Sequence, residues 1–133
     1  MAKRNIKNNL NKKTIAQVTA LANEMANKKM GSFFIITKRD ISKEYERMYP
    51  DLFSHRKINI KNKETQTLLL ALAGLDGAII IDNDGFVIDY GAKIKKTKIH
   101  LGYGTKHAAA RGISQLKDVL PIISSEEDGK VRI

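Results

Sequence analysis

The sequence predicts a single α/β domain in which helices flank a central mixed β-sheet. The chain has 133 residues, and at roughly 100–200 residues per domain this length corresponds to one domain. Short apolar runs rich in β-branched residues, at 32–37, 76–81 and 119–124, are typical of strands. They alternate with segments of helical apolar spacing, which favours an α/β fold. A turn sequence typical of β-hairpins predicts antiparallel strand pairs, so we expect a mixed sheet rather than an all-parallel one.

The first part of the chain is expected to form a helix, a strand and a second, shorter helix. Thr14 is expected to cap the first helix. Apolar residues recur at helical spacing after it: Ile15, Val18, Leu21, Ala22 and Met25. Gly31 is placed to end this helix in the left-handed conformation that suits glycine. Residues 32–37 then form a buried strand, and residues 42–48 form the short helix.

The middle of the chain predicts a helix followed by a β-hairpin. The helix spans residues 63–73 and stops at Gly74. A central strand at 76–81 follows almost at once. Residues 82–85, Asp-Asn-Asp-Gly, have the chemistry of a hairpin turn, and residues 86–89 are the expected return strand.

The last part of the chain continues the alternation of strands and helices. Its expected elements are, in order, a strand at 94–101, a loop at 101–105, a helix at 106–116, a strand at 119–124, a turn at 126–129 and a final strand at 130–133.

Composition excludes several classes of protein. Cysteine is absent, which excludes a disulfide-stapled scaffold, a cysteine nucleophile and a Cys-ligated metal centre. No apolar run approaches the roughly 18 residues of a membrane span. The charged N-terminus lacks the apolar segment of a signal peptide. We therefore expect a soluble, cytoplasmic protein.

Positive charge is the first clue to function. The net charge is +10, from 24 Lys and Arg against 14 Asp and Glu. Residues 1–13 hold five of these cations and no acid, so we expect a solvated, flexible tail ahead of a domain at 14–133. The chain is also free of acidic residues from Tyr90 to Arg111. A local positive field of this kind attracts the phosphates of a nucleotide or of a nucleic acid.

Carboxylates stand at two places where strands begin or end. Asp76 and Gly77 precede a buried strand. A carboxylate beside a residue without a side chain can hold a divalent cation while a substrate approaches the backbone; the alternative is a turn aspartate beside a packing glycine. Ser125 and Glu126 follow a later strand, where they could reach into a cleft at the same sheet edge or remain solvated.

A glycine-containing loop precedes the helix expected at residues 106–116. Glycines before a helix leave its first N–H groups open, and the positive end of the helix dipole favours an anion. Thr105 adds a hydroxyl, while Lys106 and His107 add donors in the first turn. The spacing is not that of a Walker loop. The segment is either a phosphate cradle of another design or a plain loop with a threonine cap.

Taken in order, three segments resemble the diadenylate cyclase (DAC) domain family, found in the DNA-integrity-scanning protein and its relatives. They are Leu75-Asp76-Gly77-Ala78, residues 104–114 (GTKHAAARGIS) and residues 125–129 (SEEDG). The family pattern is a DGA motif, a GTRHRAAxGIS motif and a closing SEE-x-G. The similarity extends to residues 21–36 and covers about residues 14–133, so it implies a DAC-like fold.

The resemblance implies synthesis of cyclic di-AMP from two ATP molecules, with release of two pyrophosphates and with Mn²⁺ or Mg²⁺ as cofactor. Asp76 is implied as a catalytic residue and metal ligand, His107 as a catalytic residue and Glu126 as a further metal ligand. The implied nucleotide contacts are Gly77, Ala78, Gly104, Thr105, Lys106, His107 and Ser125. Each domain would hold one ATP, so a face-to-face homodimer or higher oligomer is implied, with no membrane or nucleic-acid partner.

Two positions depart from the family pattern. Lys106 stands where the family has its first arginine, which keeps the charge but loses the bidentate fork. Ala108 stands where the family has its second arginine, which removes a charge. Arg111 lies one helical turn beyond both His107 (i+4) and Ala108 (i+3), and we expect it to contribute to nucleotide phosphate binding.

Two other functions remain open at this stage. Ala108 is compatible with a degenerate DAC domain that binds ATP or cyclic di-AMP without turnover. The net charge of +10 is compatible with a small basic nucleic-acid-binding protein. Against that second alternative, only 6% of the residues are aromatic, and the chain has no RNP-like strand, zinc finger or recognisable helix-turn-helix.

Overall fold

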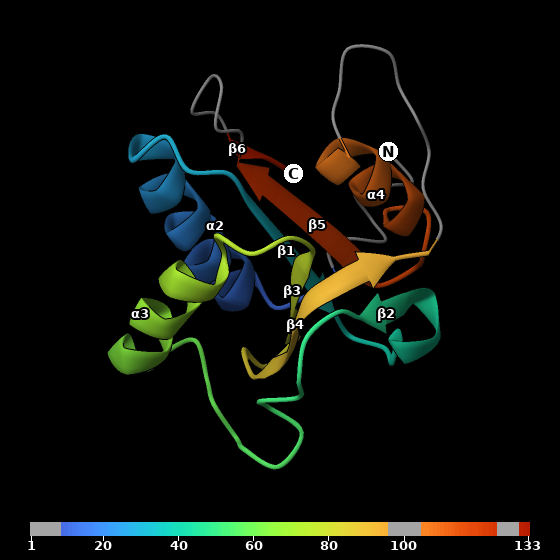
Figure 1. The fold of residues 1–133 in the computed structure, drawn as a ribbon, viewed down its shortest axis with the longest axis horizontal. Coiled ribbons are helices and arrows are strands. Elements are labelled where there is room, and N and C mark those ends of the chain that lie inside the picture. Colours follow the sequence, from blue (N-terminus) through green and yellow to red (C-terminus); the bar gives the residue numbers. More distant parts are fainter. Residues whose placement is uncertain (1–8, 96–104, 125–130) are drawn as a thin grey trace.

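Within residues 9–95, 105–124 and 131–133, which the computed structural model describes, six strands form one mixed β-sheet in the order β2-β4-β3-β1-β5-β6 (Figure 1). The strands are β1 (Ser32–Thr37), β2 (Tyr45–Arg47), β3 (Ala78–Asp82), β4 (Val87–Ile94), β5 (Val119–Ser124) and β6 (Val131–Arg132). The helices are α2 (Lys12–Asn27), α3 (Lys63–Leu72) and α4 (Thr105–Ile113), with a 3₁₀ turn at Ser42–Glu44. The predicted fold class, α/β with a mixed sheet and flanking helices, is confirmed.

The centre of the sheet is the parallel pair of β1 and β3. Phe34 lies opposite Ile79, and Thr37 opposite Asp82. On its other side β1 pairs with β5 in antiparallel register. All six residues of β1 and all six of β5 are buried, which agrees with the continuous apolar runs of the sequence. The strands predicted at 32–37 and 119–124 are confirmed with these bounds.

Helices cover both faces of this sheet, as Figure 1 shows. Phe34 and Ile36 of β1 point to the face that packs against α2 and α3. Phe33 and Ile35 point to the opposite face, which packs against Ala110 and Ile113 of α4. This alternation follows from the period of two in a strand. The molecule therefore has three layers, with the sheet in the middle.

Both ends of α2 differ from the expectation. Asn11, not Thr14, caps the helix: its side-chain oxygen accepts the backbone N–H of Lys13 at 2.9 Å. Thr14 is buried and donates its hydroxyl to the carbonyl of Asn83 in the β3–β4 turn. At the other end, Lys29 rather than Gly31 takes the left-handed conformation, with φ of 60°.

Local hydrogen bonds explain the exit from α2. The N–H of Lys29 bonds to the carbonyl of Ala26, and that of Met30 bonds to Met25. This pair is the Schellman arrangement, in which the residue just past the cap must be left-handed. The last helical turn therefore places the left-handed residue at Lys29, and glycine is not required there.

The segment predicted as a helix at 42–48 is mostly extended. Only Ser42–Glu44 forms a 3₁₀ turn, and β2 follows as an edge strand that pairs with β4. The strand β4 explains this difference, because it continues to Ile94 instead of ending at Asp89 and so offers β2 a partner. Ile94 is thus the end of β4 and not the start of a separate strand; residues 96–101 lie outside the described residues.

The other predicted elements agree more closely. The helix predicted at 63–73 is α3, capped by Asn62, and the turn at 82–85 joins β3 to antiparallel β4. The helix predicted at 106–116 begins at Thr105 and ends at Ile113, where the hydroxyl of Ser114 bonds to the carbonyl of Arg111. The predicted turn at 126–129 lies outside the described residues, and the final strand is β6.

The start of β3 lies in close contact with β4. Gly77 has a φ of 92°, and a methyl group on it would lie 2.7 Å from the carbonyl carbon of Gly91 and 2.8 Å from the nitrogen of Ala92. The methyl end of Met48 would be 2.9 Å away on the outer side. Gly77 is therefore required by the fold itself, both for its backbone conformation and for the space that it leaves.

We predict that Gly77→Ala lowers the free energy of unfolding by about 2–4 kcal/mol, because it combines a positive φ with overpacking against β4. Gly74→Ala is the matched control. A methyl group on Gly74 meets only the carbonyl of Ala71, at 3.8 Å, and Gly74 has no positive φ. Urea denaturation of the two variants should differ accordingly, and an equal loss in both would contradict this account of Gly77.

Candidate functional site

Asp76 lies at the exposed junction between α3 and β3. Its side chain is exposed, whereas Ala78, two residues later, has no exposed surface. The chain passes from helix to strand within a few residues, so the buried strand that follows holds the carboxylate of Asp76 at the edge of the sheet. By this edge we mean the end of the sheet at which the parallel strands β1 and β3 begin. The side chain of Ala78 itself lies in the core, with Ala92 and the small residues of α4.

The sheet register brings other predicted site segments to this same edge. β3 begins at Ala78, which lies opposite Ala92 near the end of β4. β5 ends at Ser124, which lies opposite Ser32 at the start of β1. Since β1 separates β3 from β5, the start of β3 and the end of β5 are two strand spacings apart, about 10 Å.

Hydrogen bonds fix the end of β5 at this edge. The hydroxyl groups of Ser32 and Ser124 bond to each other at 2.5 Å. Ser124 also donates to the carbonyl of Met30, in the turn that leads into β1. Both serine side chains are buried. Residues Ser125 and Glu126, predicted to bind nucleotide and metal, directly follow this anchored position but lie outside the described residues.

From its N-terminus to its C-terminus, helix α4 runs away from this edge. β5 starts at Val119, opposite Thr37, only a few residues after α4 ends at Ile113. The C-terminus of α4 therefore lies toward the Thr37 edge, and its first turn lies toward the edge that carries Asp76 (Figure 1). Because the first N–H groups of a helix are unpaired, this turn is suited to an anion.

The first turn of α4 consists of Thr105, Lys106 and His107, with no acidic residue. Only the backbone of these three residues is described, and Gly104 lies outside the described residues. Farther along the helix, Ala109 and Ala110 face the sheet and Arg111 is exposed. The structure thus places the start of β3, the end of β5 and the first turn of α4 at one edge.

A buried ionic group that the sequence analysis did not identify joins β2 to β4 near this edge. Asp89 of β4 is fully buried, and its two oxygens accept the Arg47 Nε at 3.1 and 2.9 Å. The Tyr45 hydroxyl donates to Asp89 at 3.0 Å. Burial, followed by the adjacent Asp89 carboxylate, raises the pKa of Tyr45, so Tyr45 stays protonated and remains a donor.

This group attaches β2 to β4 and thereby positions Met48. The N–H of Met48 donates to the carbonyl of Gly91 at 3.1 Å, and its side chain reaches Gly77. Alternating Tyr45 and Arg47 on one strand was the only sequence signal for this arrangement. Their partner, Asp89, lies 42 residues after Arg47 and 44 residues after Tyr45, so spacing could not have identified it.

Of the two predicted metal ligands, Asp76 lies in the described part of the chain and Glu126 lies outside it. Among residues 9–95, 105–124 and 131–133, no group of three or more His, Asp or Glu side chains could hold a metal ion. An exposed Asp76 nevertheless fits Mg²⁺ or Mn²⁺, because these hard cations are commonly held by one or two carboxylates together with the phosphates of a substrate. No helix of the described residues is long and apolar enough to cross a membrane.

The solved structures that the chain resembles include two bacterial ones. One is the crystal structure of a hypothetical membrane spanning protein from Bacillus cereus, with a TM-score of 0.70 and 18% identity over 95% of this chain and 61% of that one. The chain thus spans about three fifths of that protein, and the likeness concerns the fold. The other is a double mutant of DacA from Staphylococcus aureus, with a TM-score of 0.61 and 25% identity over 90% of this chain and 79% of that one.

Comparison with protein families gives a more specific result. No curated protein matches the chain. A family model described as DAC, DisA bacterial checkpoint controller nucleotide-binding, matches residues 19–133. This match covers the start of β3, the whole of α4 and the end of β5, which are the segments that the fold brings to one edge. The chain therefore belongs to the DAC family of nucleotide-binding domains.

Proposed function

We propose that this protein is a diadenylate cyclase, which condenses two ATP molecules into cyclic di-AMP and releases two pyrophosphates. The observation that supports this proposal most strongly is the shared edge of the sheet. Asp76, the first turn of α4 and the end of β5 at Ser124 come from three distant parts of the chain, and each carries or directly precedes one of the three motifs of the family. Membership of the DAC family and the likeness to DacA support the same activity.

The N-terminus of α4 binds the triphosphate in this proposal. Its unpaired N–H groups and the positive end of the helix dipole attract the phosphates. Thr105, Lys106 and His107 add a hydroxyl, a cation and an imidazole donor at the same place. Gly77 and Ala78 contribute backbone, since Gly77 has no side chain and that of Ala78 is buried. Ser125 is a further nucleotide contact.

Asp76 acts where the phosphate and the attacking hydroxyl meet. Its exposed carboxylate lies at the edge, and with Glu126 it would hold Mg²⁺ or Mn²⁺. When bound, such an ion neutralises phosphate oxygens and lowers the pKa of a coordinated hydroxyl. The protein's own contribution is to hold Asp76 and the first turn of α4 on a buried sheet, from which the chain continues after Ser124 toward Glu126.

A second copy of the chain completes the reaction. One domain holds one ATP, and ring closure requires each 3′-hydroxyl to lie in line with the α-phosphate of the other nucleotide. A two-fold homodimer with the two edges face to face satisfies both requirements with a single interface. Holding the reacting groups in this orientation can lower the barrier by about 7–11 kcal/mol relative to a chance encounter.

Ala108 favours a second candidate, a DAC domain that binds ATP or cyclic di-AMP without turnover. It replaces a family arginine by a half-buried methyl group within α4, so one phosphate-facing charge is absent. A charge-assisted hydrogen bond is worth about 1.5–3 kcal/mol, and its loss can slow turnover by tens- to hundreds-fold.

Incubation of the purified chain with ATP and Mn²⁺ or Mg²⁺ tests the proposal, with cyclic di-AMP detected by mass spectrometry. We expect product from the unmodified chain, and about a hundredfold less or none from Asp76→Asn. Asp84→Asn is the control, because Asp84 is an exposed carboxylate in the β3–β4 turn at the opposite end of β3. ATP binding without product would support the second candidate, and absence of both would refute the two.

Arg111 gives a separate prediction about phosphate binding. We expect Arg111→Ala to weaken ATP binding or turnover by about tenfold to a hundredfold, because it removes a charge one turn beyond His107. Lys117→Ala removes an exposed charge beyond the other end of α4 and should have no such effect. Unchanged ATP affinity and turnover in Arg111→Ala would show that the helix does not use this arginine.

A further inference from the structure

Met48 is an exposed apolar residue that lies against the glycine of the Asp-Gly-Ala motif. Its side chain is 41% exposed. A methyl group on Gly77 would lie 2.9 Å from Met48 Cε, so the methyl end of Met48 occupies the space that a side chain at position 77 would take. A single exposed methionine is common on protein surfaces, but this one adjoins a motif that the nucleotide-binding family model covers. A ligand that approaches Gly77 from this side therefore contacts Met48 as well.

The backbone on both sides of Met48 is anchored to β4. The N–H of Met48 donates to the carbonyl of Gly91 at 3.1 Å. Before it, Arg47 binds the buried carboxylate of β4 through its Nε at 2.9 Å. After it, the Tyr49 ring stacks on Tyr90, with the ring centroids 5.7 Å apart. The backbone of Met48 is thus fixed in place, whereas its unbranched thioether side chain can still change rotamer to fit a ligand.

The sheet register agrees with the contact between Met48 and Gly77. Arg47, the last residue of β2, lies opposite Ala92 of β4. Ala92 in turn lies opposite Ala78, the first residue of β3. The end of β2 is therefore level with the start of β3, and Met48 follows directly. This places Met48 at the edge of the sheet that carries the exposed carboxylate of Asp76.

The side chains at this edge suit different parts of a nucleotide. Asp76 and the first turn of α4 suit a hard metal ion and phosphates. The thioether of Met48 carries no charge and has no proton to donate, and Mg²⁺ and Mn²⁺ prefer oxygen ligands to sulfur. A thioether does make favourable contacts with flat aromatic rings. The base is the only part of a nucleotide that offers such a ring.

We propose that Met48 binds the adenine base of the nucleotide, with its thioether and methyl group against the ring. The inference rests on the proposed nucleotide site and adds to it a residue that lies outside the three family motifs. Leu75, which is 38% exposed and directly precedes Asp76, adds a second apolar side chain beside the same motif. The base takes no part in bond formation, so this contact favours ATP binding equally before and during the reaction.

Methyl NMR of the full chain, with ¹³C in the methyl groups of its methionines, tests the proposal. The probe is α,β-methylene ATP with Mg²⁺, because this analogue cannot release pyrophosphate. We expect a saturable shift of the Met48 signal, assigned by its absence in Met48→Leu, and no shift with inorganic triphosphate and Mg²⁺. Met25 is the internal reference, since its side chain has no exposed surface.

Calorimetry of the same titration separates the two possible failures. Binding of the analogue without a shift of the Met48 signal would overturn this inference and leave the proposed function standing. Absence of binding would refute both. A Met48 signal that moves with protein concentration, and not with the analogue, would assign this side chain to a contact between copies of the chain and would also overturn the inference.

Variants at Met48 give a second measurement. Met48→Ala should weaken binding of the analogue by about threefold to tenfold and raise the KM for ATP by the same factor, with kcat unchanged. Met48→Leu keeps the apolar volume and should stay within about twofold of the unmodified chain. Inorganic triphosphate should bind all of these chains equally. Equal affinity for the analogue in Met48→Ala, or an equal loss of triphosphate binding, would contradict a role in holding the base.

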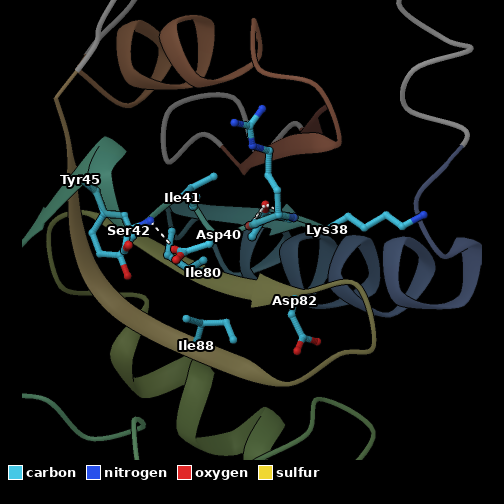
Figure 2. A pocket seen from close by; sticks show the side chains of 10 residues that line it. Lys38, Asp40, Ile41, Ser42, Tyr45, Ile80, Asp82 and Ile88 are labelled. Atoms are coloured by element: carbon cyan, nitrogen blue, oxygen red, sulfur yellow. Dashed lines mark hydrogen bonds between the residues drawn. The ribbon is translucent and has the colours of Figure 1, made fainter.

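Ile88→Ala is the matched control. Ile88 is 42% exposed, close to the value for Met48. It lines a pocket at the carboxyl ends of β1 and β3, at the other edge of the sheet, where Figure 2 shows it beside Asp82 and Ile80. Ile88→Ala should bind the analogue like the unmodified chain, and a loss as large as that in Met48→Ala would remove the support for a specific contact at Met48.

Discussion

The double-sided burial of β1 and β3 is the constraint on which the rest of the structure depends. Both strands are apolar on both faces, so each face must be covered by another layer. α2 and α3 cover one face and α4 covers the other. The antiparallel neighbours β4 and β5 then extend the sheet on either side and keep the central pair away from solvent. Each element that carries a candidate functional residue is therefore attached to this central pair.

This arrangement gives the sheet two chemically different edges. At the amino ends of β1 and β3 lie Asp76, the anchored end of β5 and the first turn of α4, where the residues suit phosphates. At the carboxyl ends of the same strands lies a pocket of about 280 Å³, whose lining includes the carboxylates of Asp40 and Asp82. The sheet therefore separates the residues proposed to bind phosphates from these carboxylates, in a chain with a net charge of +10.

Close packing between β3 and β4 fixes the start of β3, next to Asp76. Gly77 has room only for hydrogen beside Gly91 and Ala92, and the irregular register between these strands accommodates the approach. The buried Asp89 then fixes β2 over the same region through Arg47 and Tyr45. The glycine of the family's Asp-Gly-Ala motif, Gly77, is thus also required by the packing of the sheet.

The sequence by itself determined the elements whose signals are local. The runs at 32–37 and 119–124 are apolar throughout, and Asn-Asp-Gly chemistry marks the turn at 82–85, so these elements could be predicted with their bounds. The order of the three motifs likewise sufficed to identify the family. These features require no knowledge of distant contacts, because side-chain pattern and backbone preference within a few residues decide them.

Only the tertiary structure decided the features that depend on a distant partner. Residues 42–48 have no strong preference of their own, and they become a short turn and a strand because β4 continues to Ile94 and offers hydrogen bonds. Thr14 does not cap α2, because its hydroxyl donates instead to the carbonyl of Asn83 in the β3–β4 turn. The pairing of Asp89 with Arg47, and the pocket that joins Asp40 to Asp82, connect residues some 42 positions apart. Spacing along the chain does not encode such contacts, since they form only when the sheet assembles.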